Sequence, residues 1–273
     1  MREYDFYIVP TPIGNLGDIT NRAIEVLKSV DIIACEDSRN TQKLLNHFSI
    51  GTKCVSYHKF NERERVEYFI KLIKEGNKIA LVSDAGTPLF CDPGAILVRE
   101  LKKENIRVTS LPGANAVVTF LSQIPRDEEE FCFIGFLPKS ETQITDILYA
   151  HKNIDTVFYE SPNRLKDTLN IISEVFPGRM VSVGRELTKV FEEVLTDTVE
   201  NLSEYFSDKE IKGEIVTLVH KSSEHAEIRE YDDKIKALRN KKYSDKDISV
   251  ILSTLYDLNK NEVYGYLISG KNN

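Results

Sequence analysis

Short apolar runs alternate with helical patterns throughout the first half of the chain. Runs of this length, bounded by polar turns, are typical of buried strands, and the amphipathic stretches between them are typical of helices. We expect strands at 6–10, 31–36, 53–58, 78–84 and 107–113. We expect helices at 19–30, 41–48, 61–76 and 95–106. This regular alternation predicts an α/β domain with a parallel sheet.

The polar stretch PRDEEE at 125–130 interrupts this alternation, and a second series of strands and helices follows it. Strands are expected at 131–138, 155–160, 180–187 and 213–220, and helices at 141–153 and 163–176. The stretch 188–212 is expected to combine an extended segment with a helix. This series predicts another α/β domain, with a mixed rather than a purely parallel sheet.

A polar linker at 221–233 leads into a short helical module. One helix of the module begins with a Ser-x-x-Asp pattern typical of a helix cap, and its apolar residues recur about every 3.6 positions, so the module resembles a helix-turn-helix. Its basic residues are Lys234, Lys236, Arg239, Lys241 and Lys242. Two interpretations stay open: a helical hairpin packed on the body with solvated lysines, or a module that docks on RNA. The expected domains are 1–115, 116–221 and 222–273.

The loops that run from strand to helix in the first domain have an unusual composition. They read TPIGNLGD, EDSRN, AGTPLFCDPG and LPGANA. In a parallel sheet all such loops lie at the carboxyl edge, where open α/β folds bind ligands, so we expect them to converge. Arg39 is their one basic residue, and they contain no phosphate-binding glycine motif. The acidic residues at these loops favour a cofactor that carries a positive charge, or a zwitterion, over a polyphosphate.

The composition is that of an ordinary folded protein of one large or two medium domains, with 273 residues, 41% hydrophobic and 29% charged. No apolar stretch approaches the roughly 18 residues of a membrane span, and no signal peptide is evident, so we expect a cytosolic protein. The net charge of −7 argues against a generic DNA-coating protein. The four cysteines and five histidines show no metal, disulfide or triad spacing, so we expect none of these sites.

Several motifs occur in one order along the chain. They read YIVPTPIGNLGDITNRA, ACEDSRNTQKLL, IALVSDAGTPLFCDPG, LPGANA, IGFLPK, FYESPNRL and GRELTK. Together they resemble the ribosomal RNA small subunit methyltransferase I family, whose fold is similar to that of the tetrapyrrole methylases. The resemblance runs from Tyr7 to about His220 and extends to the helical tail. The chain departs from the family at Cys91, where the family usually has Ser, and at Ala114 and Asn115, where it usually has Pro followed by Ser or Cys.

The resemblance implies a specific reaction. The methyl donor would be S-adenosylmethionine, bound in a cleft between two α/β domains. The acceptor would be the 2'-hydroxyl of a cytidine in 16S rRNA of the small ribosomal subunit, at the position usually called cytidine 1402. The resemblance also implies a homodimer. The expectation of a cytoplasmic protein with no membrane or DNA partner rests on composition and charge instead.

The resemblance implies that the cofactor is held largely by main-chain atoms of the loops, where Gly and Ala allow a close approach. The implied cofactor-binding residues are Pro12, Ala85, Gly86, Thr87, Pro88, Asn115, Ala116, Tyr159, Leu187 and Gly213. Asn115 and Ala116 open a helix whose N-terminus would bind the methionine carboxylate. Gly213 would approach the adenine. Without the resemblance, Pro12 and 85–88 read as tight turns selected for backbone geometry alone.

Charged residues are placed at the cleft by the same resemblance. The implied catalytic residues are Asp37, Glu160, Arg185 and Glu186. Glu160 or Glu186 would contact ribose or amino groups, and Arg185 would contact an RNA phosphate. The other interpretation is a local ion pair between Arg185 and Glu186. Asp37, with its neighbours Glu36 and Arg39, would organise the acceptor ribose or would only cap the following helix.

Methyl transfer from a sulfonium requires that the acceptor oxygen be positioned and lose its proton. Positioning can supply roughly 7 to 11 kcal/mol of the barrier, and a general base about 10²-fold to 10⁴-fold in rate. The candidate bases are Glu160, Glu186, Asp37 and Lys189, and no metal is required. Two other functions stay open: a tetrapyrrole methylase, and a non-enzymatic RNA-binding or ribosome-assembly module. The basic tail and the loops PTPIGN and EDSRNT count against the tetrapyrrole substrate.

Overall fold

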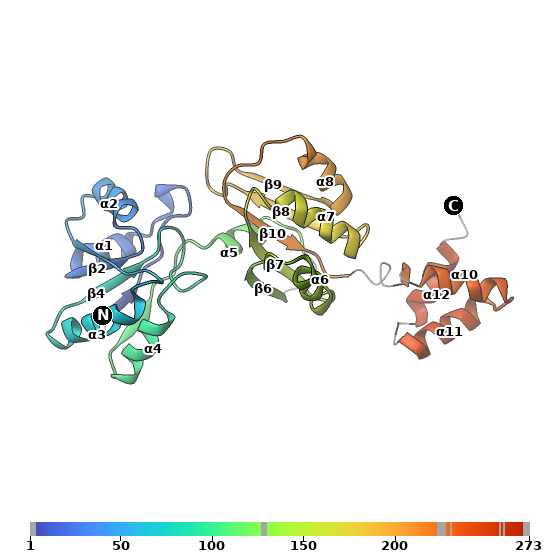
Figure 1. Cartoon of the computed structure of the whole chain (residues 1–273), viewed down its shortest axis with the longest axis horizontal. Helices are drawn as coiled ribbons and strands as arrows, with labels where there is room; N and C mark the ends of the chain where they lie inside the picture. Colours follow the sequence, from blue (N-terminus) through green and yellow to red (C-terminus); the bar gives the residue numbers. More distant parts are fainter. Residues whose placement is uncertain are drawn as a thin grey trace. The chain divides into compact units, whose positions relative to one another are not determined.

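The computed structural model describes residues 4–126, 130–222, 228–229, 231–256, 258 and 260–269. The chain forms two compact units, Met1–Pro125 with Gly184–Val194, and Arg126–Val183 with Leu195–Asn273 (Figure 1). The units divide at Pro125, next to the polar stretch PRDEEE, whereas the expected first domain ended at residue 115. Helix α5 (Ala116–Leu121) therefore belongs to the first unit. His225 and part of the predicted linker lie outside the described residues.

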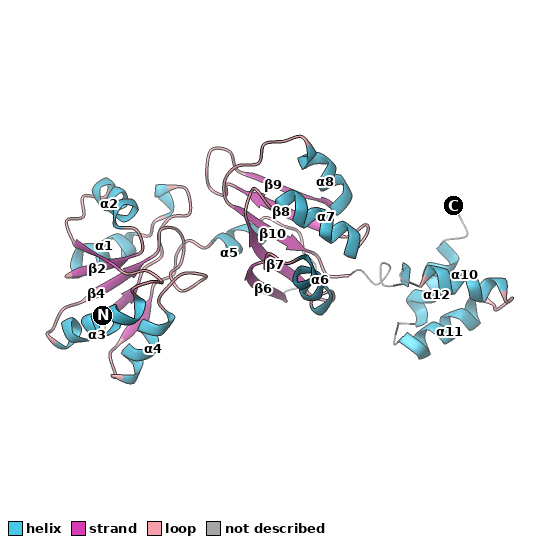
Figure 2. Ribbon diagram, in the orientation of Figure 1, coloured by secondary structure: helices cyan, strands magenta, loops and turns pink. Residues whose placement is uncertain are grey.

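Five parallel strands form the sheet of the first unit, in the order β3-β2-β4-β1-β5. Figure 2 colours the strands magenta and the helices cyan. They are β1 (Phe6–Ile8), β2 (Ile32–Cys35), β3 (Lys53–Ser56), β4 (Ile79–Val82) and β5 (Val108–Ser110). The predicted parallel sheet is confirmed. Strands β2 and β4 are neighbours, with Cys35 opposite Val82. The loops that leave these two strands therefore begin side by side at the carboxyl edge.

Helices cover both faces of this sheet. They are η1 (Leu16–Asp18), α1 (Asn21–Ser29), α2 (Ser38–His47), α3 (Glu62–Lys74) and α4 (Ala95–Lys103). Successive strand residues point to opposite faces, so Ile32 and Ile33 belong to different clusters. Ile33 packs with Leu27 of α1 and Leu45 of α2, whereas Ile32 packs with side chains of α3 and α4 such as Phe69. Helices α1 and α2 thus cover one face, and α3 and α4 the other.

The second unit contains a five-stranded mixed sheet in the order β6-β7-β10-β8-β9. Its strands are β6 (Phe131–Phe136), β7 (Asp155–Glu160), β8 (Met180–Arg185), β9 (Glu193–Thr198) and β10 (Ile215–Val219). Its helices are α6 (Glu141–Ala150), α7 (Leu165–Val175) and α8 (Val199–Ser207). The pairing of β7 is parallel to β6 and antiparallel to β10, which confirms the predicted mixed sheet. Strand β9 followed by α8 confirms the expected extended segment and helix within 188–212.

Three further helices, α10 (Asp232–Asn240), α11 (Asp245–Tyr256) and α12 (Lys260–Ser269), pack around a separate apolar cluster that includes Ile235, Leu252 and Val263. The Ser-x-x-Asp pattern is a reciprocal helix cap. The Asp247 N–H donates to Ser244 Oγ and the Ser244 N–H donates to Asp247 Oδ2, both at 3.1 Å. Within the described ranges, no helix is both long and apolar enough to cross a bilayer.

Several basic residues of this module make local contacts. The Lys234 ammonium lies 4.4 Å from the ring centre of Tyr256. Arg239 pairs with Asp245 at 3.1 Å and donates to the Leu267 carbonyl at 2.9 Å. These contacts stabilise the module internally. Packing of the module on the body and docking on RNA both stay predictions.

Candidate active site

Two strand-to-helix loops of the first unit are joined by main-chain hydrogen bonds. The Thr11 N–H donates to the Gly86 carbonyl, and the Gly86 N–H donates to the Thr11 carbonyl, both at 2.9 Å. Thr11 Oγ1 donates to the Ser83 carbonyl at 3.0 Å, and Ser83 Oγ donates to the Gly86 carbonyl at 3.2 Å. Pro12 follows Thr11, and Ala85 precedes Gly86. The bridge therefore brings these predicted cofactor-binding residues together.

The loop after β5 is joined to these two loops through Thr87. Thr87 Oγ1 donates to the Ala114 carbonyl at 2.9 Å, which ties the loop after β4 to the loop after β5. Gly86 has a φ of +79°, a left-handed conformation that side-chain-bearing residues seldom adopt. A Cβ on Gly86 would lie 3.4 Å from Ile13 Cγ2 and 3.8 Å from the Ala114 carbonyl oxygen. Glycine is therefore favoured here by backbone conformation, and an added Cβ would make van der Waals contact with the two neighbouring loops.

Asn115 uses its side chain as the N-cap of α5. Its Oδ1 accepts hydrogen bonds from the Val117 N–H at 3.0 Å and the Val118 N–H at 3.2 Å. These are two of the free amides that a helix N-terminus presents. The Asn115 side chain thus occupies two amides at this helix end. For the predicted contact with the methionine carboxylate, the main-chain amide of Ala116 is the remaining candidate.

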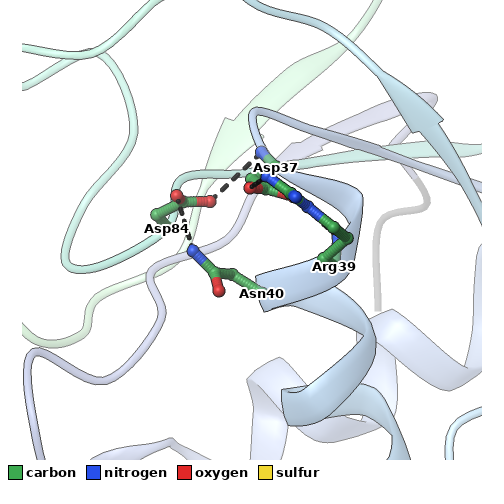
Figure 3. Close-up of polar contacts among 4 residues, drawn as sticks. All are labelled: Asp37, Arg39, Asn40 and Asp84. Carbon is green, nitrogen blue, oxygen red and sulfur yellow. Dashed lines mark hydrogen bonds and ion pairs between the residues drawn. The ribbon is translucent and has the colours of Figure 1, made fainter.

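Asp37 caps α2 and is held from both sides (Figure 3). Its Oδ1 accepts from the Arg39 N–H at 2.8 Å, and its Oδ2 pairs with the Arg39 guanidinium at 2.7 Å. Asp84, from the loop after β4, accepts from the Asp37 N–H at 3.2 Å and from Asn40 Nδ2 at 3.1 Å. Arg39 lowers the pKa of Asp37 to about 2, so this carboxylate is ionised at neutral pH. The capping interpretation is confirmed, and a contact with ribose stays a prediction.

Two carboxyl groups with raised pKa accompany Asp84. Burial, followed by the charge of Asp84, raises the pKa of Glu36. Burial, followed by the charge of Glu36, raises the pKa of Asp92 to about 6. No individual role was predicted for Asp84 or Asp92 from the sequence. The missing information was the strand order, since the adjacency of β2 and β4 is what brings their loops together.

The segment Gly184–Val194 comprises the end of β8, the start of β9 and the loop between them, and it belongs to the first unit. Arg185 Nε pairs with Glu193 at 3.2 Å, and Lys189 Nζ pairs with Glu186 at 2.7 Å. A local ion pair of Arg185 is thus present, with Glu193 as a partner. Glu186 has a φ of +52° and Thr188 a φ of +65°. Left-handed conformations of non-glycine residues are costly and concentrate at functional sites.

Two glycines mark close approaches between loops of the first unit. A Cβ on Gly14 would lie 2.5 Å from Lys189 Cγ and 2.8 Å from Thr188 Oγ1. A Cβ on Gly113 would lie 2.6 Å from Pro10 Cβ. Real Cβ atoms do not approach other atoms so closely, so both positions require glycine. The loop after β1 is therefore packed against Gly184–Val194 on one side and against the loop after β5 on the other.

Glu160 ends β7 in the second unit and is 3% exposed. Its Oε1 accepts from the Ser161 N–H at 2.7 Å, and its Oε2 accepts from Thr168 Oγ1 at 2.7 Å. Arg164 lies 3.5 Å from the same Oε2. A carboxylate that is 3% exposed and bonded through both oxygens is poorly accessible to a ribose hydroxyl. The geometry favours a structural role for Glu160.

Three other predicted cofactor-binding residues have varied surroundings. The ring of Tyr159 packs at 5.1 Å from the ring of Phe133, edge to face. Gly213 has a φ of +94° in the turn before β10. Leu187 is buried, and its carbonyl oxygen faces Gly14 of the loop after β1. Their contacts with a cofactor stay predictions.

The carboxyl edge of the first sheet combines tightly bonded main chain with negative charge. Its acidic side chains are Glu36, Asp37, Asp84 and Asp92, and Arg39 is ion-paired there. In the part of the chain that the structure describes, no three His, Cys, Asp or Glu side chains are placed to hold a metal ion. Such an edge suits a ligand that carries a positive charge and is recognised through backbone groups.

Comparison with known proteins identifies the family. Residues 5–203 match the family model described as Tetrapyrrole (Corrin/Porphyrin) Methylases. A protein of Halalkalibacterium halodurans named ribosomal RNA small subunit methyltransferase I is 48% identical over 226 residues, covering 82% of this chain and 78% of the relative. The Vibrio cholerae protein of the same name is 42% identical over 265 residues, covering 94% of this chain and 92% of the relative. The chain belongs to the ribosomal RNA small subunit methyltransferase I family.

Membership of the ribosomal RNA small subunit methyltransferase I family makes the chain a methyltransferase, and the non-enzymatic alternative is therefore wrong. Among solved structures, a diphthine synthase matches with a TM-score of 0.64 at 13% identity, covering 82% of this chain and 93% of that chain. At this identity the likeness shows the fold alone. It confirms, with the family model, the predicted fold of tetrapyrrole methylase type.

Proposed function

We propose that this methyltransferase transfers a methyl group to the 2'-hydroxyl of a cytidine ribose, cytidine 1402, in 16S rRNA of the small ribosomal subunit. The observation that carries the proposal is the match to relatives named ribosomal RNA small subunit methyltransferase I over most of the chain. The family motifs at Pro12, 36–39 and 85–88 supply the loops described above. A tetrapyrrole substrate has weaker support, because the relatives described above are named for ribosomal RNA, whereas a solved cobalt precorrin-4 methyltransferase is only 19% identical.

We propose S-adenosylmethionine as the methyl donor. The residues present fit this group, because the Thr11–Gly86 bridge holds the main chain of Pro12 and 85–88 rigidly beside an acidic edge that favours a sulfonium. Ala116 would contribute the amide of a helix N-terminus to the methionine carboxylate. Tyr159, Leu187 and Gly213 are proposed as further contacts. The bound cofactor would supply the electrophilic methyl group.

The side chains of the enzyme have to orient the acceptor oxygen and accept its proton. Asp37 is suited to orienting a hydroxyl rather than deprotonating it, because a carboxylate with a pKa of about 2 is a weak base. Glu160 is 3% exposed, and both of its oxygens accept hydrogen bonds within its own unit. Of the four candidates, Glu186 and Lys189 are left, and we propose that the Glu186 carboxylate accepts the proton while the Lys189 ammonium stays paired with it. Arg185 is proposed to bind an RNA phosphate.

We further propose that the protein is a cytoplasmic homodimer, as its family and a ribosomal substrate imply. Val190 and Phe191 support a protein interface, because they are 94% and 73% exposed at the tip of the segment between β8 and β9. Light scattering of the purified protein would give twice the chain mass of 31.2 kDa. A monomer over the micromolar range would contradict the dimer without affecting the proposed reaction.

The proposed reaction is tested with purified enzyme, S-adenosylmethionine carrying a labelled methyl group and 30S subunits from cells that lack this modification. The label is expected in 16S rRNA on a single ribose. Nuclease digestion and mass spectrometry would locate it on a 2'-O-methylcytidine. A label on a base, or no label in 16S rRNA, would contradict the proposal.

A further inference from the structure

A surface hollow of about 690 Å³ lies in the first unit between α2 and β3, which is the edge strand of the sheet. We call it the α2–β3 hollow. Three of its nine lining residues are cationic, Arg39, Lys43 and Lys53, and none is acidic. The hydroxyl and amide groups of Ser38, Thr52 and their neighbours complete the lining. Lysine, arginine and neutral hydrogen-bond donors are the groups that contact nucleic-acid phosphates.

The charge of this hollow contrasts with that of the whole chain. The net charge is −7, so a phosphate-rich partner needs a local basic surface to bind. Arg39 is partly neutralised by Asp37, at 2.7 Å. Lys43 and Lys53 are exposed and lie on two different elements that face the same hollow. They are therefore the main source of positive potential there.

The hollow begins at the candidate active site. Ser38 and Arg39 open α2 directly after Asp37, at the carboxyl edge of the sheet. A strand of RNA lying in the hollow would therefore lead to the acidic loops where the acceptor ribose is proposed to bind. The other wall, β3, leads from Lys53 into the loop that carries Phe60.

Phe60 is 97% exposed, although its loop is firmly held. Asn61 Oδ1 accepts from the His58 N–H at 2.8 Å, and Asn61 Nδ2 donates to the Ser56 carbonyl at 3.3 Å. Asn61 N–H also donates to the His58 carbonyl at 3.0 Å. An aromatic ring presented to solvent by an ordered turn has the properties of a stacking platform for an unpaired base.

We propose that the α2–β3 hollow binds the sugar-phosphate backbone of the single-stranded RNA that carries the acceptor nucleotide, and that Phe60 stacks on an unpaired base of the same strand. This inference rests on the proposed function, because it takes the RNA substrate from there. It assigns the binding of backbone charge to Lys43 and Lys53 and the stacking to Phe60. The two kinds of interaction respond differently to salt, which makes them separable.

The test uses the full-length protein and 30S subunits that lack the modification. The variant K43A/K53A is expected to bind these subunits at least roughly tenfold more weakly than the wild type at ~0.1 M salt. The slope of log K against log salt concentration should become shallower by about 0.7 for each single-strand phosphate that the variant no longer neutralises. The matched control K71A/K102A removes two exposed lysines from α3 and α4, on the other face of the sheet, and should bind as the wild type does.

The variant F60A is expected to lose roughly 5-fold to 150-fold in affinity for the same particles with an unchanged salt slope, because stacking releases no counterions. All variants should bind S-adenosylmethionine with wild-type affinity and melt at the wild-type temperature. If K43A/K53A matches its control in affinity and slope, the hollow is not an RNA site. If F60A binds normally, the stacking assignment fails. Methylation of the particles by the wild type tests the proposed function separately, so its failure is distinguishable from failure of the hollow.

Discussion

Thr11 and Gly86 exchange a pair of main-chain hydrogen bonds, each 2.9 Å long. They form an isolated antiparallel bridge outside the parallel sheet, and it joins the loop after β1 to the loop after β4. Such a bridge fixes both loops without using any side chain. The exposed backbone groups on either side of it are therefore held at constant positions, which suits recognition of a small ligand.

We expect Gly86→Ala to weaken the binding of S-adenosylmethionine at least tenfold. Alanine at a φ of +79° costs about 1 to 2 kcal/mol in backbone strain, and its Cβ would lie 3.4 Å from Ile13 Cγ2. The loop would relieve this strain by shifting away from Thr11. Isothermal calorimetry measures the effect directly.

Gly76→Ala is the matched control for this variant. Gly76 has a φ of +95° and no atom within 4 Å of its Cβ position, so it carries a similar backbone cost without crowding. It lies after α3, at the opposite edge of the same sheet. Equal loss of cofactor affinity in both variants would remove the loop after β4 from the binding site.

Periodicity was sufficient to predict the first sheet and its loops, because parallel strands place every strand-to-helix loop at one edge. It could not predict the strand order. The sequence separates Asp37 from Asp84, and only the adjacency of β2 and β4 lets Asp84 accept from the Asp37 N–H. The raised pKa of Asp92 depends on the same adjacency, because part of it comes from the charge of Glu36.

Side-chain orientation was the second kind of information missing from the sequence. Glu160 ends a strand, as the family motif predicts, yet its carboxylate turns toward Ser161 and Thr168 rather than remaining free. The Asn115 side chain likewise accepts hydrogen bonds from the first amides of α5 as its N-cap. Such choices depend on which donors lie within reach after packing, and no spacing rule in one sequence encodes them.

Asp92→Asn should change how stability depends on pH. The pKa of Asp92 is about 6 in the folded protein and 3.8 ordinarily, so between about pH 4 and 6 the folded state binds more protons than the unfolded state. Stability due to this group therefore falls as the pH rises through that window. The variant lacks the penalty and should gain roughly 1 kcal/mol over the wild type at pH 7.5 relative to pH 4.5, after allowance for partial solvent screening. Urea unfolding at the two pH values measures the difference.

Asp37→Asn is a control of opposite sign. Arg39 lowers the pKa of Asp37 to about 2, below its ordinary value of 3.8. The ionised carboxylate therefore stabilises the fold above about pH 4, and this contribution is lost as the pH falls through about 2. The Asn variant should be less stable than the wild type at pH 7.5. A gain in stability in both variants would show that general charge reduction, rather than the individual environments, is responsible.

Glu160→Gln should lower stability by about 1 to 3 kcal/mol while leaving cofactor affinity and kcat within about twofold of the wild type. The amide can accept at one position only, so either the Ser161 N–H or the Thr168 hydroxyl loses its acceptor, and the other keeps only an uncharged one. Thr168→Val is the matched control, because it removes a donor to the same carboxylate. Urea unfolding and steady-state kinetics give the two readouts. A large fall in kcat at unchanged stability would instead place Glu160 in the reaction.

Gly14→Ala tests whether the segment Gly184–Val194 takes part in methyl transfer. A Cβ at this position would lie 2.5 Å from Lys189 Cγ and 3.0 Å from the Leu187 carbonyl oxygen. The lysine stem can move aside, but the carbonyl belongs to a backbone already constrained by left-handed residues on both sides. The segment must therefore shift. Glu186, the proposed proton acceptor, and its ion-pair partner Lys189 would move with it.

We expect kcat of the Gly14→Ala variant to fall by roughly 10-fold to 100-fold, because displacements near 1 Å at a reacting centre have effects of this size. Gly17→Ala is the control from the same loop, where the added Cβ meets only the Asn15 side chain, at 3.2 Å from its Oδ1, and no atom of Gly184–Val194 within 4 Å. It should retain wild-type kcat. Single-turnover methylation of 30S subunits separates the chemical step from product release. If Gly14→Ala keeps the wild-type rate, the position of this segment does not limit the reaction and the proposed proton acceptor must be sought elsewhere.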